Sequence, residues 1–163
     1  EIAQCLVGSE MCIRDRGECH GGSMLLHPVV HLHLFNSCGE LYLQKRPAWK
    51  DIQPGRWDTA VGGHVDWGEE PLAALRREVR EEVGVTDFEP QHVLTYLFES
   101  ERERELVYVY KTVYDGPVVP SGELDGGRFW TLREIAEGVG GGIFTPNFEG
   151  EIRRVAELPD VGR

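Results

Sequence analysis

The stretch GHVDWGEEPLAALRREVREEVGV, residues 63–85, decides the fold of this 163-residue chain. Proline suits the first turn of a helix and glycine suits a left-handed exit from its last turn. Pro71 and Gly84 therefore predict a helix over residues 71–83. At about 100° per residue, one face of this helix is apolar. The residues expected on that face are Leu72, Leu75, Val79 and Val83.

The adjacent helix face gathers the carboxylates of Glu78, Glu81 and Glu82. Like charges at these spacings repel by about 0.2–0.5 kcal/mol per pair on an exposed helix. A divalent cation turns that cost into a binding site, and an all-oxygen donor set suits Mg²⁺ or Mn²⁺. Arg77 lies four residues before Glu81 and can orient it through an ion pair. The alternative is a solvated helix face in which the glutamates pair with Arg77 and Arg80.

The spacing of the whole stretch resembles the Nudix box. The box specifies a glycine, a glutamate after five free residues, Arg-Glu-aliphatic after seven more, then Glu-Glu, and finally glycine with an aliphatic residue. The matching residues are Gly63, Glu69, Arg77, Glu78, Val79, Glu81, Glu82, Gly84 and Val85.

The resemblance to Nudix hydrolases implies an α/β fold, an α/β/α sandwich with a mixed central sheet. It implies Glu78 and Glu82 as the main metal ligands, and Glu81 as a further ligand or the catalytic base. The carbonyl of Gly63 is implied as another ligand. Glu69 is expected to shape the loop and the start of the helix.

Composition places the chain among single-domain proteins of ordinary hydrophobicity. The net charge of −11 argues against nonspecific binding to nucleic acid or membranes, and no apolar run approaches the roughly 20 residues of a membrane span. The four cysteines form no CxxC pair, so neither a zinc ribbon nor a disulfide framework is indicated. A reducing cytoplasm is the expected location.

The first sixteen residues, EIAQCLVGSEMCIRDR, differ in character from the rest. They do not start with methionine, and they resemble translated sequencing-adapter read-through. Residues 1–16 are therefore expected to be an artefactual leader, with a natural disordered leader as the alternative. One Nudix hydrolase domain is expected over residues 17–163.

Hydrophobic patterning predicts alternating strands and helices after that leader. A hairpin is expected around the turn at residues 36–39, and a loop at residues 47–56. Strands are predicted at residues 29–35, 40–45, 57–61, 91–98, 105–114 and 129–130. Besides the box helix, helices are predicted at residues 131–137 and 145–158.

Beyond the box, the chain resembles the branch of Nudix proteins related to isopentenyl-diphosphate isomerase. The matching segments are Glu18-Cys19-His20, His27-Pro28, LFNSCGELYLQKRP at residues 34–47 and WDTAVGGHV at residues 57–65. The resemblance implies a second divalent site for Mn²⁺, Mg²⁺ or Zn²⁺. Its ligands would be His20, His27, His64, Glu103 and Glu105. The alternative is that these histidines are ordinary surface or core residues.

Two further histidines, His31 and His33, alternate on one strand and match no ligand position, so a structural role is expected for both. The isomerase also needs a cysteine two residues before the third histidine, and this chain has Gly62 there. The intact box and the missing cysteine favour hydrolysis over isomerisation. The alternatives left open are an isopentenyl-diphosphate isomerase and a non-catalytic nucleotide sensor.

The expected reaction is metal-dependent hydrolysis of a diphosphate linkage, in a nucleoside diphosphate derivative or a related organic pyrophosphate. Lys45, Arg46 and Arg56, together with Lys50, surround a loop and are candidates to bind substrate phosphates, with a solvated basic loop as the alternative. Glu81, Glu103 or Glu105 would accept the proton of the attacking water. Dimers are common in this family, so a homodimer is one expected assembly. The partner is expected to be a small molecule.

Overall fold

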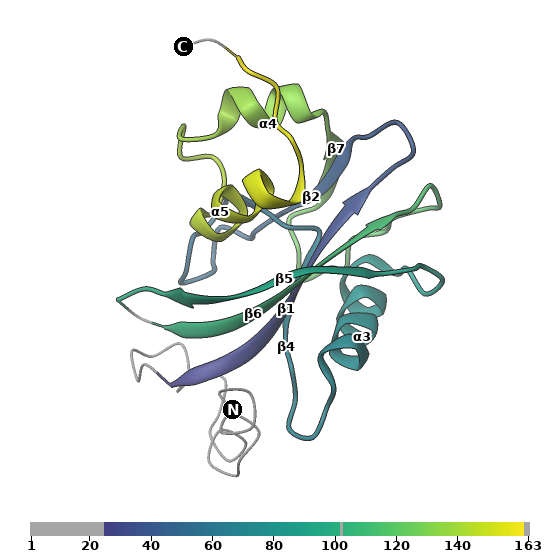
Figure 1. The fold of residues 1–163 in the computed structure, drawn as a ribbon, viewed down its shortest axis with the longest axis vertical. Helices are drawn as coiled ribbons and strands as arrows, with labels where there is room; N and C mark the ends of the chain where they lie inside the picture. Colours follow the sequence, from purple (N-terminus) through teal and green to yellow (C-terminus); the bar gives the residue numbers. More distant parts are fainter. Residues whose placement is uncertain (1–24, 102, 162–163) are drawn as a thin grey trace.

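The structure, a computed structural model, describes residues 25–101 and 103–161. Its centre is a mixed seven-stranded sheet in the order β3-β2-β1-β6-β5, with β4 added beside β1 and β7 beside β2 (Figure 1). The strands are β1 (Leu26–Phe35), β2 (Leu41–Lys45), β3 (Trp57–Asp58), β4 (Val61–His64), β5 (Gln91–Glu99), β6 (Arg104–Val113) and β7 (Gly127–Trp130). The helices are α3 (Pro71–Val83), α4 (Leu132–Gly138) and α5 (Pro146–Val155).

The long strand β1 organises the sheet because it pairs with three other strands. It runs antiparallel to β2 and to β4, and parallel to β6 over its whole length. In the pairing with β4, Val30 lies opposite Gly63 and His31 lies opposite Gly62. The start of the predicted box is therefore fixed to the centre of the sheet.

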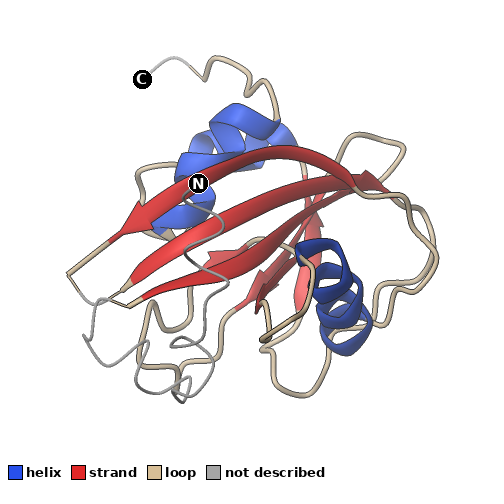
Figure 2. Ribbon diagram, turned by 60° about the horizontal axis from the view of Figure 1, so that its bottom comes forward, coloured by secondary structure: helices blue, strands red, loops and turns tan. Residues whose placement is uncertain are grey.

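Helices cover both faces of the sheet, and the alternation of side chains along β1 decides what each face meets (Figure 2). Val30, Leu32 and Leu34 join a core cluster with α3. His31 and His33 point to the opposite face, where both contact Glu151 of α5. A second core cluster packs β2 and β7 against α4 and α5. The predicted α/β class with a mixed sheet between helices is confirmed.

The predicted elements are present with small differences in their bounds. The strand expected at residues 57–61 is two short strands, β3 and β4. The last helix ends at Val155 rather than at residue 158. Leu72, expected on the apolar face of the box helix, is 43% exposed, because it lies in the first turn while the buried residues follow it. The expected leader lies outside the described residues.

In the described part of the chain, no helix is both long enough and apolar enough to cross a membrane. Trp57 packs edge-on against Trp130, with ring centroids 5.1 Å apart. The Trp57 ring is partly buried against the second core cluster, whereas Trp49 is 71% exposed.

Candidate functional site

The helix α3 holds the box against β4. It begins at Pro71 and ends at Gly84, whose φ of 70° is the left-handed conformation that favours glycine. Its buried residues include Leu75, Val79 and Val83, which join the core with β1. Packing on that side turns Glu78, which is itself buried, toward β4.

Arg77 ties the loop before α3 to the carboxylates on the helix. Its guanidinium donates to both carboxylate oxygens of Glu69, at 2.9 and 3.0 Å, and to the carbonyl of His64 at 2.9 Å. It also donates to Glu78 at 2.7 Å and approaches Glu81 at 3.6 Å. The hydrogen bond and charge of Arg77 lower the pKa of Glu69. The predicted pairing with Glu81 is therefore the weakest of these contacts, and Arg77 mainly fixes Glu69 and Glu78.

The glycines of β4 make room for the box carboxylates. A Cβ on Gly63 would overlap the carboxyl group of Glu78, so only glycine fits opposite that side chain. The N–H of Gly62 donates to Glu82 at 3.3 Å, and the amide of Gln44 approaches the same oxygen at 3.5 Å. Burial raises the pKa of Glu82 to about 8, and the nearby charge of Glu78 adds to this rise. A cation between these two carboxylates would offset their mutual repulsion.

The box faces a cavity of about 840 Å³. Among its described lining residues, Arg46 and Lys50 are the only lysine or arginine side chains. Carboxyl groups come from eight lining residues: Asp51, Asp58, Glu78, Glu81, Glu82, Glu103, Glu105 and Glu123. A polyanionic substrate can enter such a cavity only with cations that offset the carboxylates. Oxygen donors of this kind fit Mg²⁺ or Mn²⁺.

A second group of candidate ligands comes from β1, from β6 and from the turn just before β6. His27, Glu103 and Glu105 are buried, and each offers a ligand atom within 4.8 Å of the others. Burial alone lowers the pKa of His27, but the hydrogen bond and charge of Glu105 outweigh it, so the net shift is upward. The box glutamates form no equally tight group of three in the described residues. His27, Glu103 and Glu105 fit a divalent ion through one nitrogen and two carboxylate donors.

The other predicted residues occupy different positions. His64 lines the cavity and stacks on His27, with ring centroids 5.2 Å apart. Arg46 also lines the cavity, where it pairs with Asp58 at 3.3 Å. Lys45 and Arg56 do not line this cavity, and Arg56 donates to the carbonyl of Phe144. His20 lies outside the described residues.

Several residues of the cavity were not expected from the sequence. They are Val29, His31, Gln44, Ile52, Gln53, Asp58, Ser121, Glu123, Thr145 and Asn147, besides Asp51 of the basic loop. His31 had been expected to be structural. The alternation of His31 with Val30 and Leu32 was a usable signal, because it places a polar side chain on the face opposite the apolar one.

The NUDIX domain family model matches residues 25–148, so the chain belongs to the Nudix family. A protein of Pseudomonas aeruginosa described as an uncharacterized Nudix hydrolase is 34% identical over 118 residues, covering 72% of this chain and 66% of that protein. An isopentenyl-diphosphate Delta-isomerase of Serratia proteamaculans is 31% identical over 118 residues, covering 69% of this chain and 64% of that protein. The match thus spans just under two thirds of the length of these relatives. The predicted family, and with it the class of a Nudix hydrolase domain, is confirmed.

Solved structures agree with the fold. The crystal structure of DR0079 from Deinococcus radiodurans has a TM-score of 0.71 at 26% identity, covering 80% of this chain and 83% of that one. A MutT protein from Methanosarcina mazei has a TM-score of 0.68 at 24% identity, covering 79% of this chain and 91% of that one. The second likeness is one of fold alone.

Proposed function

We propose that this protein hydrolyses a diphosphate linkage, in a nucleoside diphosphate derivative or a related organic pyrophosphate, with Mg²⁺ or Mn²⁺. The observation that carries the proposal is the position of Glu78, Glu81 and Glu82 in the lining of a single large cavity that is rich in carboxylates. Family membership supports the same reaction.

Glu78 and Glu82 would hold the metal, with Glu81 and the Gly63 carbonyl as further donors. A bound divalent ion supplies charge neutralisation at phosphorus and lowers the pKa of water. Arg77 keeps Glu78 in place through its 2.7 Å contact. His27, Glu103 and Glu105, with His64 and His20, are the proposed ligands of a second ion, which can be Mg²⁺, Mn²⁺ or Zn²⁺.

The water that attacks phosphorus must lose a proton as the new P–O bond forms and the bridging P–O bond breaks. The carboxylate of Glu81 is suited to accept it, because its side chain is 54% exposed and its contact with Arg77 is a long one. Glu103 and Glu105 are the alternative bases. Arg46 and Lys50, which line the same cavity, are proposed to bind the substrate phosphates, and Lys45 and Arg56 remain candidates from the sequence.

The group attached to the diphosphate would lie in an adjoining cavity of about 530 Å³. The two cavities share Asp51, Ile52, Gln53, Glu103 and Asn147. The adjoining one adds Phe98, Pro54 and Pro146, which offer apolar surface, and the polar side chains of Arg56, Ser100 and Glu101. The substrate is therefore proposed to be a small molecule with a partly apolar or aromatic moiety beyond its diphosphate.

The test is a screen of nucleotide sugars, dinucleotides, oxidised nucleotides and isoprenoid diphosphates with Mg²⁺ and with Mn²⁺, following phosphate or nucleotide release. Glu82→Gln is the comparison, because it removes one charged donor while keeping the shape of the side chain. We expect turnover by the wild type and a loss of roughly 100-fold or more in the variant. Equal turnover by both proteins would contradict the metal assignment.

Isopentenyl-diphosphate isomerisation is the second candidate, favoured by the close group of His27, Glu103 and Glu105. Against it, Gly62 stands at the position of the required cysteine, and Cys38, the sole cysteine of the described residues, is exposed in the turn after β1. Formation of dimethylallyl diphosphate without phosphate release would establish this candidate. Tight nucleotide binding with no product would instead indicate a sensor.

A further inference from the structure

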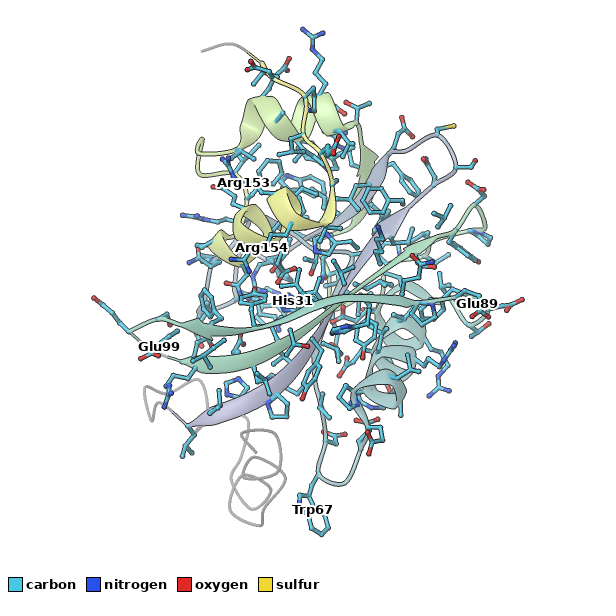
Figure 3. All side chains as sticks on the ribbon, in the orientation of Figure 1. His31, Trp67, Glu89, Glu99, Arg153 and Arg154 are labelled. Atoms are coloured by element: carbon cyan, nitrogen blue, oxygen red, sulfur yellow. The ribbon has the colours of Figure 1, made fainter. Side chains whose placement is uncertain are left out.

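A buried polar cluster centred on Glu151 lies between the sheet and α5. Glu151 is 1% exposed, and its carboxylate accepts hydrogen bonds from His31 at 2.7 Å, His33 at 2.8 Å and the Tyr96 hydroxyl at 2.6 Å. Figure 3 shows His31 in the interior of the molecule, beside α5. The cluster therefore joins two strands, β1 and β5, and the helix α5 through one carboxylate.

Buried charged groups such as these stabilise a core less effectively than apolar side chains do. Well-packed apolar residues are often at least as stabilising as a buried ion pair, so stability alone does not account for the presence of this pair. Burial disfavours the charged form of His31, but the charge and hydrogen bond of Glu151 outweigh it and raise the pKa of His31 to about 9. The same contacts hold the pKa of Glu151 below its ordinary value. At neutral pH the pair is an imidazolium beside a carboxylate.

The two histidines of the cluster differ in the surroundings of the ring nitrogen that does not bond Glu151. His33 is fully buried and does not line the cavity. His31 uses Nδ1 for Glu151 and lines the cavity that holds the box. Its Nε2 lies on the other edge of the ring and makes no hydrogen bond to any described residue.

Gly62 leaves this edge of the imidazole open. A Cβ built on Gly62 would stand 3.6 Å from His31 Nε2 and 3.5 Å from Cδ2, in van der Waals contact with this edge of the ring. Gly62 is also the residue whose N–H contacts Glu82. The Nε2 edge of His31 thus lies beside β4, the strand that carries the start of the box.

We propose that His31 binds the substrate, donating its Nε2–H to a non-bridging oxygen of the diphosphate, and that Glu151 is its positioning residue. The assignment rests on the proposed function, since it places this donor in the same cavity. An imidazolium has two N–H donors, and Glu151 occupies one of them. A charge-assisted bond to phosphate is the strongest use of the other, in a cavity with few cationic side chains.

The two histidines allow a matched pair of variants. In His31→Asn the amide nitrogen replaces Nδ1 and keeps the bond to Glu151, while the donor that faces the cavity is removed. In His33→Gln the amide nitrogen replaces Nε2 and likewise keeps the bond to Glu151. Both variants keep one amide hydrogen bond to Glu151, but only the first removes a cavity donor.

The experiment is calorimetric titration with methylenediphosphonate, a diphosphate that cannot be hydrolysed, in saturating Mg²⁺. We expect His31→Asn to bind it roughly tenfold or more weakly, and His33→Gln to stay within about threefold of the wild type. Glu151→Gln should weaken binding as His31→Asn does. Equal affinity in the wild type and His31→Asn, equal losses in His31→Asn and His33→Gln, or no binding by the wild type would each overturn the assignment.

A measurement on the wild type keeps the test independent of whether the variants fold. In ¹⁵N-histidine-labelled protein, the Nε2 resonance of His31 should shift on addition of methylenediphosphonate, while the resonances of His33 should not. No shift at His31 contradicts the proposal. Absence of hydrolysis together with this shift would reject the proposed reaction and retain the binding role of His31. Normal hydrolysis without the shift would retain the proposed reaction and reject the binding role of His31.

Discussion

Gly63 of β4 and Glu78 of α3 are in such close contact that a methyl group on the glycine would occupy the position of the glutamate's carboxyl group. The two residues belong to the first and central parts of the box and are brought together by the loop that Arg77 ties to the helix. The glycine is therefore required by the glutamate opposite it. The φ of Gly63 is not in the left-handed region, so the requirement is one of space.

Replacing Gly63 by alanine should lower the rate of hydrolysis strongly and the unfolding free energy only moderately. Gly63→Ala must push Glu78, the proposed metal ligand, away from β4, and a shift of about 1 Å in an active-site group can cost roughly 100-fold in rate. The overpacking itself should cost about 1–3 kcal/mol of unfolding free energy. Rates of diphosphate hydrolysis under Mg²⁺ and urea unfolding measure the two effects. Gly62→Ala is the control for folding, because its Cβ meets neighbours at ordinary distances of 3.5 Å or more. Wild-type turnover by Gly63→Ala would show that Glu78 has no fixed role.

Arg77 should not be replaceable by lysine. Its planar guanidinium binds Glu69 through two nitrogens and reaches Glu78 and the His64 carbonyl as well, which one ammonium group cannot do. Arg77→Lys is expected to lower the unfolding free energy by about 1–3 kcal/mol. Arg133→Lys is the matched control. Arg133 is 79% exposed and pairs with Glu137, and both residues lie on α4. The unfolding free energy should therefore change by less than about 0.5 kcal/mol. Equal losses in thermal unfolding would contradict the role of Arg77 as an organiser.

What the sequence predicted well is what a single continuous segment determines. Residues 63–85 carry both the helix signals and the carboxylate spacing, so the box helix is found at Pro71–Val83 as expected. The predicted strand bounds were also close to the observed ones, since the alternation of apolar and polar residues is a local pattern. The division of residues 57–64 into β3 and β4 was missed because it depends on pairing with β2 and β1, which no local pattern specifies.

What the sequence did not predict depends on contacts between distant segments. His31 and Glu151 are 120 residues apart, and their contact exists only once α5 covers the sheet. Asp58 and Glu123 likewise reach the cavity from separate parts of the chain. Conversely, Lys45 is next to Arg46 in sequence but does not line this cavity, because adjacent residues of an extended chain point to opposite sides, and Arg56 lines only the adjoining cavity.

The His31–Glu151 pair should give the protein a characteristic pH dependence of stability. The pKa of His31 is raised from 6.5 to about 9, so its stabilising contribution is complete below pH 6.5 and is lost as the pH rises through 9. The pKa of Glu151 is lowered, so its contribution is present above pH 4.5 and is lost as the pH falls well below that value. Groups facing His31 from other elements are Asp58, Glu105 and, through Glu151, Tyr96.

Urea unfolding at pH 6.5, 7.5 and 9 measures this contribution. The wild type should lose about 3 kcal/mol relative to His31→Asn over this interval, since one pKa unit corresponds to about 1.4 kcal/mol. Subtracting the variant removes the other titrating groups. A difference that does not change with pH would mean that His31 is neutral in the folded protein.

Glu82 should release a proton when Mg²⁺ binds. Burial and the charge of Glu78 raise its pKa to about 8, so at pH 7 the metal-free carboxyl group is mostly protonated, and a metal ligand must be deprotonated. Calorimetric titration of Mg²⁺ in buffers of different ionisation enthalpy measures the number of protons released. We expect most of one proton at pH 7 and much less at pH 9, since the carboxyl group is then already ionised. Glu82→Gln should abolish this release, whereas the same release in the variant would assign the proton to another carboxyl group of the cavity.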